Sequence, residues 1–281
     1  MPRLFLREKT MRPFDLHIHS YMSDGTFAPE ELPAMALERG VELMALTDHD
    51  TAAGCRQAVD AGAKIGVKVI CGMEIDAEFP SELHILALGI DPAHPDILRY
   101  EQWRKGERED RNSRILAKLR AMGIDTEPFM EHSRGNDTRL HIAKALVSGG
   151  WAPSLKDAFD RYIGSGAPAY QPSRRISRRE AVELAESAGG VSVLAHPCKL
   201  KADPHCLVRE LADYGLWGVE AFYPISTPGQ RKMFLSLAGQ YGLMPTCGSD
   251  FHGKNRDVLI GAAYSDRAEL EPAYGYFAAR S

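Results

Sequence analysis

The sequence predicts an α/β protein built on a parallel sheet, either open or closed into a barrel, with an all-helical insertion. β-rich segments alternate with helical segments in the first and last thirds of the chain. A charged stretch without any β-rich segment interrupts this alternation from about residue 92 to residue 170. The 281 residues are sufficient to bury the core of a single barrel.

The individual elements follow from these patterns in chain order. Residues 14–20 have the period-2 pattern of a strand, and residues 28–40 predict a helix with Pro29 near its start and Gly40 after its end. The other elements expected in the first third are strands at 41–50, 67–75 and 81–90 and a helix at 52–66. After the insertion we expect helices at 177–189, 204–215 and 227–242, strands at 190–197 and 217–224, and a strand-to-loop end at 243–253.

The middle of the chain predicts helices only. A long charged helix is expected at 95–123, and its run KGEREDRNSR is interpreted as an exposed helix face. Shorter helices are expected at 138–150 and 154–164. We therefore expect a flexible leader at 1–12, a barrel domain formed by 13–91 and 171–281, and a helical insertion domain at 92–170. The leader lacks the apolar core of a signal peptide, and Met11 is an alternative start.

Composition and charge limit the class of protein. A net charge of -4 supplies no basic field, so we expect no tight binding to long nucleic acid. No apolar run is long enough to cross a bilayer, so no membrane association is expected. The five cysteines have no CxxC spacing, which argues against a zinc ribbon or a disulfide framework. Together these features favour a protein of the reducing cytoplasm.

Metal-binding residue types recur at the carboxyl ends of the predicted strands. His17 and His19 are two residues apart, so on a strand their imidazoles point to the same side and form a chelating pair. Other such ends carry Asp24, His49, Glu74, His84, His196, Asp250 and His252. Side chains from successive strand ends meet at one mouth of a parallel barrel, where such folds place their active sites. Histidine and carboxylate without thiolate suit Zn, Mn or Fe.

These motifs resemble those of the polymerase and histidinol phosphatase (PHP) superfamily. The matching segments are DLHIHS, SDG, LTDHD, GMEI, ELHILALGI, LAHP and GSDFH, in the family's order between residues 15 and 253. The insertion segment TRLHIAKAL, the return GAPAY and the ending GSDFH are most similar to the TrpH-type branch. Studied members of that branch are 3',5'-nucleoside bisphosphate phosphatases.

The resemblance implies a distorted (β/α)7 TIM-like barrel that holds three divalent metal ions. Carried over by motif, the first metal would be held by His17, His19, Glu74 and Asp250. Glu74 would bridge to a second metal held by His84 and His196, and a third would lie between Asp24, His49 and His252. Mn²⁺ is the expected ion, with Zn²⁺ and Fe²⁺ as alternatives. Catalytic roles are implied for His17, His19, Glu74, His196, Asp250 and His252.

The implied activity is hydrolysis of the 3'-phosphate of nucleoside 3',5'-bisphosphates, such as pAp to AMP, by attack of a metal-activated hydroxide. A related activity is the 5'-to-3' trimming of short 5'-phosphorylated oligoribonucleotides. The expected partner is thus a small phosphorylated nucleotide or a short oligonucleotide. A PHP-type histidinol-phosphate phosphatase and a non-catalytic metal-binding PHP module are the alternatives, against which the insertion and the complete set of ligand positions argue.

Candidate substrate-binding residues lie on or near the insertion. Arg139 matches a family arginine that contacts substrate phosphate, and its alternative is a solvated helix charge. Lys199 stands where relatives often carry arginine and is a second phosphate candidate. Tyr170 would stack on a base or simply pack, and Arg174 would bind phosphate or remain a solvated loop charge. Ile225 departs from the branch, whose members often place a histidine in that loop.

Overall fold

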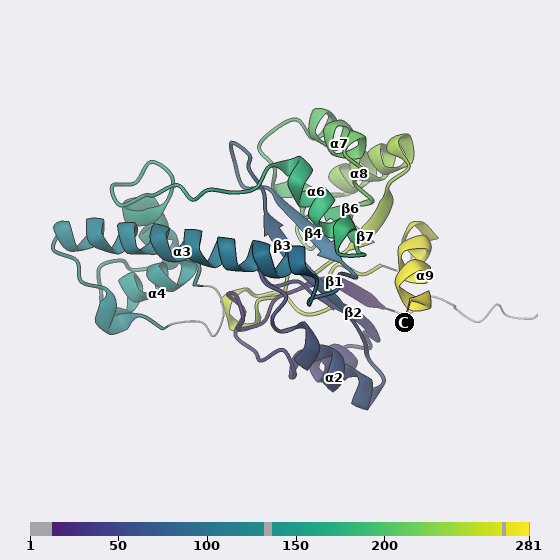
Figure 1. Cartoon of the computed structure of the whole chain (residues 1–281), viewed down its shortest axis with the longest axis horizontal. Coiled ribbons are helices and arrows are strands. Elements are labelled where there is room, and N and C mark those ends of the chain that lie inside the picture. Colours follow the sequence, from purple (N-terminus) through teal and green to yellow (C-terminus); the bar gives the residue numbers. More distant parts are fainter. Residues whose placement is uncertain (1–12, 132–136, 266–267, 281) are drawn as a thin grey trace, which may run out of the picture.

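The structure, a computed structural model, describes residues 13–131, 137–265 and 268–280 (Figure 1). The predicted leader at 1–12 lies outside these residues. Within them, one seven-stranded sheet follows the order of the sequence, and the strand positions agree with the predicted ones. The strands are β1 Phe14–Ile18, β2 Leu43–Leu46, β3 Lys68–Asp76, β4 His84–Leu88, β5 Val191–Leu194, β6 Gly218–Phe222 and β7 Met244–Cys247.

The sheet curls into a nearly closed barrel, as the fold prediction requires. The first strand meets the segment that follows the last one: the Asp250 amide donates to the His17 carbonyl at 2.8 Å, and the His19 amide donates to the Phe251 carbonyl at 2.9 Å. Apolar side chains such as Leu16 and Ile75, which alternate with His17 and Glu74 along their strands, belong to one continuous buried core. At the barrel mouth, the first strand and the segment after the last strand therefore lie side by side.

The prediction of an all-parallel sheet is wrong for one strand. β4 runs antiparallel to both β3 and β5, whereas the other neighbouring pairs are parallel. Only residues 77–83 join β3 to β4, which is too short a connection for the crossover helix that a parallel pair needs. The period-2 pattern of a strand carries no information about its direction.

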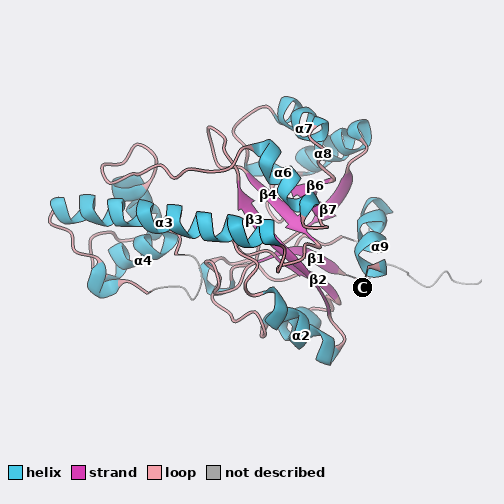
Figure 2. Cartoon of the chain, viewed as in Figure 1, coloured by secondary structure: helices cyan, strands magenta, loops and turns pink. Residues whose placement is uncertain are grey.

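Helices cover the outside of the strands (Figure 2). They are α1 Leu32–Glu38, α2 Cys55–Ile65, α6 Arg178–Ser187, α7 Pro204–Asp213, α8 Pro228–Tyr241 and α9 Glu271–Ala279. All but α9 fall in segments predicted to be helical. α9 lies beyond the recognised motifs, and it packs Phe277 against Trp217 with ring centroids 5.6 Å apart. Short 3₁₀ turns occur at Glu127–Phe129, Pro197–Lys199, Gly253–Asn255 and Ala268–Leu270.

The segment between β4 and β5 is helical, as predicted. It contains α3 Pro95–Ala121, α4 Arg139–Ser148, α5 Leu155–Ala158 and a π turn at Phe159–Ile163, which replaces the end of the helix expected at 154–164. The far half of α3 extends beyond the sheet with α4 beside it (Figure 1). Ile115 and Leu119 of α3 share a separate buried cluster with Ile142 and Leu146 of α4. This separate core supports the proposed insertion domain.

The prediction that KGEREDRNSR forms an exposed helix face holds for one side of the helix, where Lys105, Glu109 and Asp110 are exposed, and is wrong for the other. Arg108, Arg111 and Asn112 of this run are buried, and Arg104, just before it, is completely buried. Several of these groups find polar partners on the barrel and in the return loop, which makes their burial tolerable. No helix in the described residues is both long and apolar enough to cross a membrane.

Candidate metal centre

The nine predicted ligands gather at one mouth of the barrel, although one arrives by an unexpected route. His17 lies on β1, Glu74 lies near the end of β3, and His196 follows β5. His84, expected at the carboxyl end of a strand, is instead the first residue of β4. Because β4 is antiparallel, its amino end lies at the same mouth as the carboxyl ends of its neighbours.

The first group contains the residues predicted for the first metal: His17, His19, Glu74 and Asp250. One donor atom from each lies within 4.8 Å of all the others. The Nε2 atoms of His17 and His19 are 3.1 Å apart, which confirms that the two imidazoles point to the same side. His17 Nε2 is also 3.3 Å from Glu74 Oε1 and 3.5 Å from Asp250 Oδ1. All four residues are buried.

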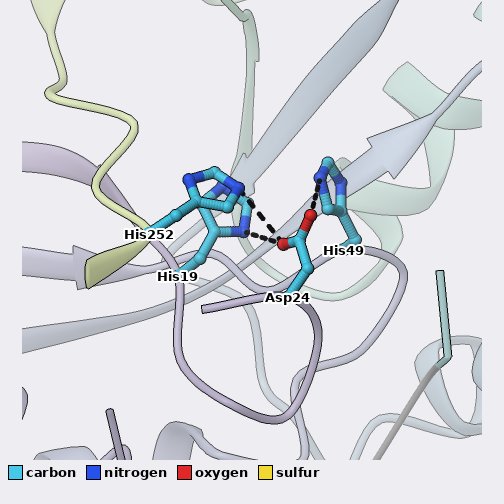
Figure 3. A group of neighbouring side chains, drawn as sticks. All are labelled: His19, Asp24, His49 and His252. Atoms are coloured by element: carbon cyan, nitrogen blue, oxygen red, sulfur yellow. Dashed lines mark ion pairs between the residues drawn. The ribbon is translucent and has the colours of Figure 1, made fainter. Parts of the chain in front are cut away.

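A second group surrounds Asp24 (Figure 3). It unites Asp24 with His49 and His252, as predicted, and adds His19. His252 Nε2 lies 3.1 Å from Asp24 Oδ1, and His49 Nε2 lies 3.9 Å from Asp24 Oδ2. His19 thus stands between the first and second groups and offers one nitrogen to each.

A third group is built on Glu74. Donor atoms of His49, Glu74 and His84 lie within 4.8 Å of one another. The predicted partner His196 is adjacent, with its Nε2 atom 2.9 Å from Glu74 Oε1 and 3.3 Å from His84 Nδ1. Glu74 therefore contacts residues of two groups, which agrees with its expected bridging position.

The donor atoms at this mouth fit divalent cations. Glu74 Oε2, Asp250 Oδ1 and His252 Nε2 are buried and make no hydrogen bond within the described residues. Buried polar atoms without hydrogen bonds are costly and uncommon in native folds. A cation between convergent carboxylate oxygens and imidazole nitrogens would satisfy them, and this nitrogen and oxygen donor set suits Mn, Zn or Fe.

Carboxylates and imidazoles at this mouth stabilise one another's charged forms. Burial alone would lower the pKa values of His19 and His84, but contacts with Glu74, and for His19 also with Asp250, raise each pKa to about 9. Burial alone would raise the pKa of Glu74, but the surrounding imidazoles of His84, His17 and His49 hold it well below its usual range. Burial lowers the pKa of His196 to about 4, so its ring is neutral at pH 7. Carboxylate and neutral imidazole are the forms that coordinate metals, so Glu74 and His196 already have the coordinating form, whereas a bound cation would displace the protons of His19 and His84.

Glu220 on β6 is a supporting residue that sequence analysis missed. Its carboxylate accepts a 2.6 Å hydrogen bond from the His196 amide and lies 3.1 Å from His17 Nδ1. Such a contact fixes the His17 tautomer with Nε2 free to face the donor cluster. A Cβ at Gly248 would stand 2.2 Å from Glu220 Oε1, so this position requires glycine. The available signal was one acidic residue inside the apolar strand WGVEAFYP.

Two buried aspartates organise the loops around the ligands. Asp48 accepts hydrogen bonds from the Ser20 amide at 2.8 Å and from the Ser23 hydroxyl at 2.7 Å. Asp15 accepts from the amides of Ser249 at 2.9 Å and Gly261 at 2.7 Å. Both aspartates therefore hold the ligand loops through backbone amides, and Asp48 also through serine hydroxyls, rather than through the imidazole nitrogens.

Three non-glycine residues at this mouth have a positive φ. They are Asp50 at 54°, His196 at 28° and Asp250 at 56°. Such conformations are uncommon for non-glycine residues and persist where the surrounding structure enforces them. Of the residues that the structure describes, only these combine a side chain with a positive φ, and each belongs to a ligand loop.

A cavity of about 680 Å³ opens beside the candidate ligands. Of the predicted substrate residues, Arg139, Tyr170 and Lys199 line it, whereas Arg174 is largely exposed and its guanidinium lies 3.9 Å from Glu107. The neighbouring residue Arg175 lines the cavity instead. Sequence analysis missed further basic residues of the wall, namely Arg108, Arg111, Lys201 and Arg256.

Comparison with known proteins identifies similar chains. The PHP domain pattern matches residues 15–128. A 5'-3' exoribonuclease of Haemophilus influenzae is 33% identical over 88% of this chain and 96% of its own length. A 3',5'-nucleoside bisphosphate phosphatase of Chromobacterium violaceum is 32% identical over 88% of this chain and 91% of its own. A phosphoribosyl 1,2-cyclic phosphate 1,2-diphosphodiesterase of Eggerthella lenta is 33% identical over 85% and 94%.

Two solved structures have the same fold. One is an amidohydrolase from Chromobacterium violaceum with bound sulfate, with a TM-score of 0.85 and 29% identity over 95% of this chain and 96% of that one. The other is a candidate metal-dependent phosphoesterase from Bifidobacterium adolescentis, with a TM-score of 0.80 and 29% identity over 92% and 94%.

Proposed function

The chain belongs to the PHP domain family and is a metal-dependent phosphoesterase, and we propose that it removes the 3'-phosphate from nucleoside 3',5'-bisphosphates. The reaction would convert pAp to AMP and inorganic phosphate. One observation carries the proposal: the cavity joins the candidate metal ligands to a wall of basic side chains. A substrate with two phosphates would meet a basic environment at both ends.

The size and lining of the cavity suit a nucleotide. A volume of about 680 Å³ lies within the range of sites that bind small organic molecules. Tyr170 and Phe159 add aromatic surface beside Arg139, whose guanidinium carbon lies 6.0 Å from the centre of the Tyr170 ring. We assign Tyr170 to packing against the base and Arg139 to the phosphate that is not hydrolysed.

The candidate ligands would hold divalent cations, which supply charge neutralisation of the phosphate and an activated water. We propose three such ions, one for each donor group, with Mn²⁺ as the expected metal. Lys199 and Arg256 add positive charge at the edge of this cluster, because both form ion pairs with Asp250 Oδ2 while lining the cavity. The Tyr223 hydroxyl donates to the same oxygen at 2.7 Å and leaves Asp250 Oδ1 directed toward His17 and His19.

The named relatives support hydrolysis of phosphoesters on ribose. The relative from Chromobacterium violaceum is named for the proposed reaction, and that from Haemophilus influenzae for the stepwise degradation of RNA. The name of the Haemophilus influenzae relative favours a further candidate activity, the trimming of short oligoribonucleotides from the 5' end. Both activities place a phosphoester at the metals and a second phosphate nearby. Histidinol phosphate, with one phosphate, would leave the distal basic wall unused.

Product release from three substrates tests the proposal: inorganic phosphate from pAp and histidinol phosphate, and mononucleotide from a 5'-phosphorylated dinucleotide. The purified chain is incubated with Mn²⁺ and, separately, with pAp, histidinol phosphate and a 5'-phosphorylated dinucleotide. We expect pAp to give the highest kcat/KM, and Glu74→Gln to abolish all turnover. Preference for histidinol phosphate would overturn the proposal, and preference for the dinucleotide would make RNA trimming the main activity.

A further inference from the structure

Arg111 on α3 is a buried cation that forms no ion pair with a carboxylate within the described residues. Only 5% of its surface is exposed. Its Nε and Nη2 atoms both donate to the neutral Asn112 side chain, at 3.2 and 2.9 Å. A guanidinium offers five N–H donors, so part of its capacity is unused by the protein's described groups.

The preceding turns of α3 provide a direct contrast. Arg104 and Arg108 lie on the same side of the helix, and both form ion pairs with Asp50 Oδ2. Arg111 lies one turn further on and forms no ion pair among the described residues; Arg108 and Arg139 are its strongest charged neighbours, and the opposing effect of the Asp76 carboxylate is weaker. Burial, reinforced by these like charges, lowers the pKa of Arg111. A buried charge without a partner destabilises a fold, so its presence needs a reason other than stability.

The position of Arg111 supplies that reason. Arg111 lines the same cavity as the candidate ligands His84 and His196, together with Arg139. Arg139 likewise makes no hydrogen bond or ion pair through its guanidinium in the described part of the chain, and burial lowers its pKa too. Two guanidinium groups without carboxylate partners thus share one wall of an open cavity. A planar guanidinium matches a phosphate, which can accept two parallel hydrogen bonds from it.

We propose that Arg111 is a specificity-determining residue that binds the substrate phosphate remote from the metal centre. The inference rests on the proposed function, because it requires a substrate that carries a second phosphate. A bound phosphate would supply the negatively charged partner that Arg111 lacks among the described residues. The residue would then select two-phosphate substrates at a cost in the stability of the free protein.

Binding of AMP tests this role without relying on turnover. Calorimetry with the full-length, Mn²⁺-loaded chain would compare the wild type with Arg111→Met and Arg111→Lys. Loss of a charge-assisted contact should weaken AMP binding by about 10- to 100-fold in Arg111→Met, with partial recovery in Arg111→Lys. The matched control is Arg114→Met, which removes an exposed arginine of the same helix and should change affinity less than about twofold.

Thermal unfolding of the same variants separates a binding role from a structural one. Arg111→Met should melt at the wild-type temperature or above, because it removes a buried charge that lacks a carboxylate. Arg108→Met should melt lower, because it removes a partner of Asp50. Unchanged AMP affinity in Arg111→Met, or a melting temperature several degrees below wild type, would overturn the proposal. If AMP binding depends on Arg111 but pAp is not hydrolysed, only the proposed reaction is refuted.

Discussion

Arg104 attaches the helical insertion to the metal centre, and its removal should be severely destabilising. The side chain is 0% exposed and donates to Asp50 Oδ2 at 3.0 Å, to Asp76 Oδ2 at 3.2 Å and to the Arg174 carbonyl at 2.6 Å. Arg104→Met removes these bonds, together with one to the Ser173 hydroxyl, and leaves the Asp50 and Asp76 carboxylates buried. Breaking a buried ion pair from one side costs about 3–5 kcal/mol. Because Arg108 still pairs with Asp50, we expect the free energy of unfolding to fall by about 3 kcal/mol, the lower end of that range.

Urea unfolding of the metal-free chain at pH 7 measures this loss. Wild type and Arg104→Met are compared with the same dependence of the unfolding free energy on urea concentration. A shift of the urea concentration at the unfolding midpoint then reports a change in stability alone. The matched control is Arg114→Met on the same helix, whose exposed pair with Asp110 should contribute less than about 0.5 kcal/mol. A loss below about 1 kcal/mol in Arg104→Met, or one equal to that of the control, would refute the reasoning.

Three further predictions concern the metal centre. Glu220→Gln replaces one acceptor oxygen by a donor beside His17, so Mn²⁺ affinity measured by equilibrium dialysis should fall by about 10- to 100-fold. Mn²⁺ at about 100 times its Kd should raise the free energy of unfolding by about 2.7 kcal/mol, with a much smaller rise in Glu74→Gln; equal rises would place the ion elsewhere. Gly248→Ala, whose Cβ would stand 2.3 Å from His17 Cβ, should lose Mn²⁺ binding in dialysis, whereas Gly239→Ala on open helix surface should keep it.

Local sequence patterns predicted most of the helices and strands, and the features that they missed have a physical explanation. Alternating side chains located β1 to β7 because one or both faces of each strand are buried. The same alternation is identical in either direction, so it could not reveal that β4 is antiparallel. The position of His84 at the start of that strand was hidden for the same reason. α9 was missed because no predicted pattern extended to the end of the chain.

The candidate ligands were predictable from motifs, whereas their supporting groups were not. Residue type and order placed the histidines together, but the contact between Glu220 and His17 joins residues far apart in the sequence. The basic residues of α3 show the same limit. Sequence alone could not distinguish Arg108, which forms an ion pair with a carboxylate, from Arg111, which forms none among the described residues. Ion pairing is a tertiary property, because it depends on which loop meets the helix.

Asp50 links the two parts of the proposed site. It directly follows the candidate ligand His49, it has a φ of 54°, and its carboxylate accepts from Arg104 and Arg108 of α3. The same loop therefore fixes the position of a metal ligand and the position of the helix that carries Arg111. A displacement of α3 would move Arg111 relative to the metals and, through Asp50, would also move His49. Asp50 thus contributes to the spacing between the candidate metal ligands and the proposed phosphate site, and a variant at Asp50 should impair metal and AMP binding together, whereas Arg111 variants should impair AMP binding alone.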